Sequence, residues 1–158
     1  MLVQANLPRP LLVLDTNVVL DWVAFDDQRV LPIAAAIERK ALPLVSNDAC
    51  LQELRRALAY TQVRLDAGAQ AHAFGRYLAQ AKMFEPAVPP SAADLPRCED
   101  PDDQKFIELA WHARASHLLT RDKALLKLAR RLSDRFAVLA PDAFLVWMAA
   151  RARPRPPS

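Results

Sequence analysis

Glycine is scarce in this sequence, with only Gly68 and Gly75 among 158 residues. Both lie in a stretch of otherwise helical composition, so neither GxGxxG nor GxxxxGK[ST] occurs, and binding of a nucleotide by a phosphate-cradling loop is not expected. The motifs GxSxG and HExxH are absent as well. The three histidines, His72, His112 and His117, lack the spacing of metal ligands, and we expect them to be surface or partly buried side chains.

Cysteine and long apolar runs are also lacking. Cys50 and Cys98 lie far apart and belong to no CxxC or Cys/His pattern, which argues against a disulfide framework and against a zinc site. The N-terminal MLVQANLPRP has neither the charged nor the apolar region of a signal peptide, and the longest apolar runs are the length of strands. We therefore expect a soluble, cytoplasmic protein with reduced thiols and no membrane segment.

The formal charge of +3 does not indicate a generally basic protein. Three arginines lie in the final RARPRPPS, so the rest of the chain is balanced (+3 minus 3). Nucleic acid would then be met by local arginine patches rather than by the whole surface. The length and the 53% content of hydrophobic residues predict one globular domain over residues 1–150, followed by a disordered Arg/Pro tail over 151–158.

Short apolar runs alternate with segments of helical periodicity along the chain. The runs predict strands at 11–15, 42–45, 117–120 and 136–139, and the periodic segments predict helices at 18–25, 28–40, 46–60, 61–84, 101–115, 122–132 and 141–151. The segment 61–84 is one helix or a pair, and 85–96 is a proline-rich loop. This alternation predicts an α/β fold, a three-layer α/β/α sandwich with a central parallel sheet.

Acidic residues follow the strands of this predicted sheet. Asp15 ends the first strand, Asp122 comes just after the third, and Glu53 lies early in the helix that follows the second. Helices that follow strands begin at the edge where the strands end, and ligands of open parallel sheets bind there. We expect these three carboxylates to converge. Asp103, in the first turn of the helix over 101–115, joins them if the preceding loop delivers it to that edge.

Four carboxylates in one pocket would repel one another if no cation were bound. Oxygen ligands without histidine or thiolate suit Mg²⁺ or Mn²⁺ better than zinc. Such an ion activates water and stabilises the charge that develops in phosphodiester cleavage. The acids therefore suggest metal-dependent hydrolysis of a nucleic acid.

Each acid also has a purely structural interpretation. Asp15 and Asp122 are suitable helix N-caps, a role that is compatible with metal binding in the case of Asp122. Asp103 would favour the helix dipole and complete a capping box with Asp100. Glu53 would pair with Arg56, three residues later on the same helix.

The segments LLVLDTNVVLD, ACLQELRRAL, EDPDDQKFIELA and HLLTRDKALL together resemble the PIN-domain nucleases, especially the small bacterial toxins of toxin-antitoxin pairs. The resemblance covers roughly residues 10–146. It implies a parallel sheet between helices and an Mg²⁺- or Mn²⁺-dependent endoribonuclease. It also implies an RNA substrate, a cognate antitoxin as partner, and a homodimer.

By this resemblance the catalytic and metal-binding residues are Asp15, Glu53, Asp103 and Asp122, with Asn17 and Thr120 supporting them through hydrogen bonds. Asp103 matches the third acid because it stands seven residues before Ala110, and Asp100 and Asp102 are its competitors. Glu53 would ligate a second ion or position the attacking water. Two other functions share these motifs: an RNA-processing nuclease without an antitoxin, and a catalytically silent PIN-like module that binds RNA or protein.

Basic and aromatic residues are less specific indicators. Arg121 and Lys123 flank Asp122 closely enough to meet a phosphate, although basic residues on helices are commonly a solvated face. The tryptophans Trp22, Trp111 and Trp147 are expected to pack in the core or an interface rather than to stack on bases.

Overall fold

The computed structural model describes residues 10–85 and 95–152. Within them the chain forms β1 (Leu12–Leu14), α1 (Thr16–Val23), α2 (Leu31–Glu38), β2 (Leu44–Ser46), α3 (Asp48–Leu58), the 3-10 turn η2 (Thr61–Val63), α4 (Ala67–Leu78), β3 (Ala81–Met83), the 3-10 turn η3 (Pro101–Asp103), α5 (Gln104–His112), β4 (His117–Leu119), α6 (Lys123–Leu126), α7 (Ala129–Leu132), β5 (Ala137–Leu139) and α8 (Pro141–Ala152).

The five strands form one parallel sheet in the order β3-β2-β1-β4-β5. β1 is central and pairs with β4 so that Leu14 lies opposite Leu119. The residues that follow these strands, Asp15 and Thr120, are therefore neighbours at the carboxyl edge of the sheet. This register brings together two parts of the chain that are 105 residues apart.

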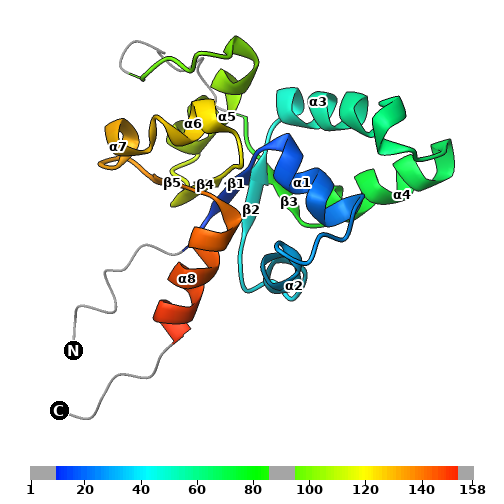
Figure 1. Cartoon of the computed structure of the whole chain (residues 1–158), viewed down its shortest axis with the longest axis horizontal. Helices are drawn as coiled ribbons and strands as arrows, with labels where there is room; N and C mark the ends of the chain where they lie inside the picture. Colours follow the sequence, from blue (N-terminus) through cyan, green and yellow to red (C-terminus); the bar gives the residue numbers. More distant parts are fainter. Residues whose placement is uncertain (1–9, 86–94, 153–158) are drawn as a thin grey trace.

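Side chains of alternating direction give the sheet two apolar faces. Leu12 and Leu14 of β1 pack in one buried cluster with residues of α1, α2, α3, α4 and α8, whereas Val13 packs in a second cluster with residues of α5, α6 and α7. Figure 1 shows α5–α7 on one side of the strands and α1–α4 on the other. The three-layer α/β/α sandwich predicted from the sequence is thus confirmed.

The sequence prediction differs from the structure in two segments. Residues 61–84 are not purely helical, because they end in β3, a strand that was not predicted from the sequence. Its residues Ala81, Lys82 and Met83 lack β-branched side chains, and Ala81 is half-buried while the other two are exposed, so only their pairing with β2 defines the strand. Residues 122–132, predicted as one helix, form the separate short helices α6 and α7.

The ends of the helices follow ordinary capping chemistry. Asn47 caps α3 by accepting the Cys50 amide at 2.9 Å, and Ser46 ends β2. Asp100 caps the 3-10 turn η3, after which α5 begins at Gln104. None of the described helices combines the length and the apolar character needed to cross a bilayer. Helix α8 takes in Arg151 and Ala152 of the predicted tail, and residues 153–158 lie outside the described part of the chain.

The three tryptophans pack against the chain's own side chains. Trp22 is buried and makes an edge contact with Tyr77, and Trp147 stacks on Phe144. Trp111 is 43% exposed, but the guanidinium of Arg135 lies 5.0 Å from the centre of its ring.

Candidate metal centre

Asp15 is the acid at the centre of the sheet edge. It is 3% exposed and caps α1, where its Oδ1 accepts the Val18 amide at 3.0 Å. Its Oδ2 accepts a hydrogen bond from the hydroxyl of Thr120. Burial raises the pKa of Asp15, and the hydrogen bonds from Thr120 and Val18 oppose that increase.

Thr120 connects two of the acids. Its hydroxyl donates to Asp15 and accepts the backbone amide of Asp122 at 2.9 Å, and its side chain is fully buried. Asp122 caps α6 by accepting the Ala124 amide at 2.7 Å. A single buried hydroxyl thus fixes the first and the fourth predicted acids relative to each other.

Asp103, at the end of η3, is the third acid at this edge. The pKa of Asp103 is raised to about 7. Burial is the largest cause, followed by a hydrogen bond with Asp122 and by the charges of Asp122, Asp100 and Asp15. Its Oδ2 is buried and has no hydrogen-bond partner among the described residues. Asp100 and Asp102 are exposed. Asp103 is therefore the acid of this segment that lies against Asp122.

Glu53, on α3, is bound by different groups. Its Oε2 accepts a hydrogen bond from the hydroxyl of Thr16, and its Oε1 lies 2.6 Å from Nζ of Lys105. The alternative pairing with Arg56 is wrong. In the described parts of the chain, no group of three or more Asp, Glu, His or Cys side chains is arranged to hold a metal ion as it stands. The acids are brought to one edge, but their carboxylates are not in a coordinating geometry.

Asn17 differs from Thr120 in its surroundings. It is the second residue of α1, and its side chain is exposed and makes no hydrogen bond that involves the described residues. It lies two residues from Asp15, at the same edge of the sheet. The hydrogen-bonding role expected of Asn17 stays a prediction.

Sequence reasoning missed the partner of Arg121. This side chain, for which we considered a phosphate contact or a solvated position, donates from Nε at 2.7 Å and from Nη2 at 3.0 Å to the two carboxylate oxygens of Asp21 on α1. Burial raises the pKa of Asp21, whereas Arg121 lowers it. A charged residue among the apolar residues of VVLDWVAF was the available signal. The pair ties the loop that carries Asp122 to α1.

A cavity of about 1040 Å³ lies elsewhere in the molecule. Its lining includes His117 and Ala137, the first residues of β4 and β5. The acids follow the last residues of β1 and β4, so the cavity opens at the opposite edge of the parallel sheet. It is not part of the candidate centre.

The four predicted acids lie in a part of the chain that matches a known protein family. The family model described as "PIN domain" matches residues 11–124, a range that contains all four predicted acids. The chain belongs to the PIN-domain family. PIN domains are generally nucleases, which hydrolyse phosphodiester bonds and typically use divalent metals. A search of curated proteins found no match.

Proposed function

We propose that this PIN domain is an endoribonuclease that depends on Mg²⁺ or Mn²⁺. The observation that carries the proposal is the convergence of Asp15, Asp103 and Asp122 at the carboxyl edge of the sheet. Neighbouring carboxylates repel one another when ionised, and this repulsion adds to burial, the largest cause, in raising the pKa of Asp103. A hard divalent cation removes this conflict, because it prefers oxygen ligands.

The oxygen donors of these residues are of the kind that such a cation binds. Asp103 contributes a buried oxygen without a hydrogen-bond partner in the described chain, and Asp15 and Asp122 contribute oxygens beside it. Asp15, Asp103 and Asp122 would hold the ion, with Glu53 at the border of the site. When bound, the ion would supply Lewis-acid chemistry, which lowers the pKa of water and stabilises charge on a phosphate.

The surrounding residues would keep the acids in place. Thr120 donates a hydrogen bond to Oδ2 of Asp15, whereas Oδ1, which caps α1, accepts the Val18 amide. The Asp21–Arg121 ion pair anchors the loop before Asp122. Rigid support of this kind is what an oxygen-ligand site needs, because outer contacts orient the ligands.

We further propose that the protein is the toxin of a toxin-antitoxin pair, held inactive by a cognate antitoxin and acting as a homodimer on RNA in the cytoplasm. The support for these finer points is the resemblance of the four sequence segments to small bacterial PIN toxins. An antitoxin-independent nuclease shares the same centre. Expression in a bacterial host separates the two: arrested growth that is relieved by the product of a neighbouring gene is the result expected of a toxin.

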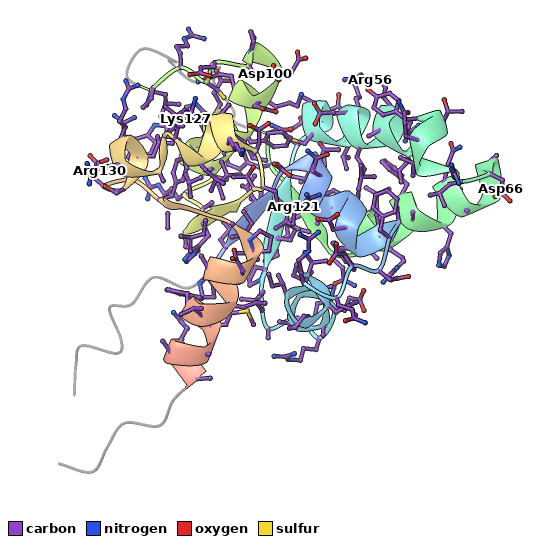
Figure 2. All side chains as sticks on the ribbon, in the orientation of Figure 1. Arg56, Asp66, Asp100, Arg121, Lys127 and Arg130 are labelled. Carbon is purple, nitrogen blue, oxygen red and sulfur yellow. The ribbon has the colours of Figure 1, made fainter. Side chains whose placement is uncertain are left out.

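Cleavage of a structured RNA by the purified protein tests the catalytic proposal. We compare the parent with Asp15→Asn and Asp66→Asn, because both aspartates cap helices and asparagine preserves capping. Figure 2 shows Asp66 at an end of the molecule remote from Arg121. Cleavage should require Mg²⁺ or Mn²⁺, stop with EDTA, vanish in Asp15→Asn and persist in Asp66→Asn. Equal cleavage by the parent and Asp15→Asn would reveal a contaminating nuclease and remove the assignment.

A further inference from the structure

Glu53 is already bound by two donors of the chain itself. Its Oε1 lies 2.6 Å from Lys105 Nζ, and its Oε2 accepts the hydroxyl of Thr16. The side chains of Glu53 and Lys105 are each 20% exposed, so the ion pair is largely shielded from water. Both carboxylate oxygens of Glu53 are therefore engaged before any metal binds.

The other three acids have no such cation. Asp15 and Asp122 accept hydrogen bonds from backbone amides and, for Asp15, from Thr120, while Asp103 keeps a buried oxygen without a partner. None of these three forms a salt bridge with another residue of the described chain. The excess negative charge thus lies at Asp15, Asp103 and Asp122, and the charge of Glu53 is balanced.

The position of Lys105 is fixed by its place in the fold. It is the second residue of α5, two residues after Asp103, and α5 packs against α3, which carries Glu53. Its ammonium also lies 5.5 Å from the ring centre of Phe106, which is buried. The segment that brings the third acid to the sheet edge therefore brings an ammonium group to Glu53 as well.

We propose that Lys105 takes the place of a second metal ion at Glu53, so that the site binds one divalent cation. This inference rests on the proposed function. A divalent ion that bound Oε1 of Glu53 would have to displace Nζ from a contact of 2.6 Å, or else lie beside a like charge. Lys105 is a positioning residue in this scheme: it holds Glu53 at the border of the site and keeps it from acting as a metal ligand.

Counting Mn²⁺ ions bound per chain tests the inference without a cleavage assay. The full chain, freed of metal, is titrated with Mn²⁺ by calorimetry, and free Mn²⁺ is followed by electron paramagnetic resonance. Lys105→Met keeps an unbranched side chain one atom shorter than that of lysine and removes its charge. Lys123→Met is the matched control, because Lys123 is exposed and forms no salt bridge within the described residues.

We expect one Mn²⁺ for the parent and for Lys123→Met, two for Lys105→Met, and one again when Glu53→Gln is added to Lys105→Met. Two ions in the parent, or one in a Lys105→Met variant whose circular dichroism is native, would overturn the inference and leave the proposed function standing. No ion in the parent would remove both.

Glu53→Gln alone keeps the inference testable if Lys105→Met does not fold. It should retain the single Mn²⁺ with an unchanged affinity, whereas Asp103→Asn should weaken binding by more than about tenfold. Loss of the ion in Glu53→Gln would identify Glu53 as a ligand and overturn the role given to Lys105.

Discussion

Replacing Arg121 with methionine should destabilise the protein, because it would leave the carboxylate of Asp21 buried without its cation. The Asp21 side chain is 6% exposed and receives two hydrogen bonds from the guanidinium. Breaking a buried ion pair costs about 3–5 kcal/mol. The Arg121 side chain is 39% exposed, and solvent screening reduces that cost. We therefore expect a loss of about 2–3 kcal/mol, or a Tm lower by about 5–10 °C.

The loss should depend on pH in a definite direction. Burial raises the pKa of Asp21 above the ordinary value of 3.8, and removal of Arg121 should raise it further. A carboxyl whose pKa is raised in the folded state contributes stability that is full below its unfolded-state pKa. That contribution is lost as the pH rises through the folded-state value. Arg121→Met should therefore be more destabilised at pH 8 than at pH 5.

Urea denaturation at the two pH values measures both effects. Adding Asp21→Asn to Arg121→Met should recover most of the stability and abolish the extra pH dependence. Arg29→Met is the matched control, because Arg29 pairs with Asp27 at the surface and its side chain is 63% exposed. This control should change stability little. A loss in Arg121→Met as small as that of the control, or equal at both pH values, would refute the account of the buried pair.

Three further predictions follow from burial and pKa. Mn²⁺ should raise the Tm more at pH 8 than at pH 6, because Asp103 has a pKa of about 7 and a proton on its carboxylate competes with the ion. Equal Tm shifts at the two pH values in scanning fluorimetry would contradict this. Cys50, whose pKa burial raises to about 12, should react with a thiol reagent far more slowly in the native protein than in urea. Leu118→Ala should lower the free energy of unfolding, measured by urea denaturation, by about 2–5 kcal/mol, because Leu118 is fully buried. A loss below about 1 kcal/mol would show that the core collapses into the space left by the leucine side chain.

The central strands could be predicted from the sequence because buried strands consist largely of apolar residues. LLVL is a continuous apolar run and HLLT has two leucines at its centre, as expected for strands covered on both faces. β3 could not be predicted in this way, because Ala81, Lys82 and Met83 form an exposed edge strand that only its neighbour defines. The composition of residues 81–83 does not indicate that they pair with β2.

The acids of the candidate centre were likewise predictable where local rules placed them. Asp15 and Asp122 follow strands, and a parallel sheet puts such residues at one edge. The partners of Glu53 and Arg121 were not predictable, because Lys105 lies 52 residues from Glu53 and Asp21 lies 100 residues from Arg121. Each basic residue also has other acids nearer in sequence. Only the packing of α3 against α5, and of α1 against the loop after β4, selects the pairs.

The pairing of β1 with β4 has a consequence for the synthesis of the protein. The strand that carries Asp15 gains its second neighbour only when residues 117–119 have been added, and Asp122 follows them. A contact between strands so far apart in the sequence forms late, because closing the long intervening chain costs entropy before the contact can stabilise the sheet. A nascent chain that has not reached residue 122 thus lacks part of the centre.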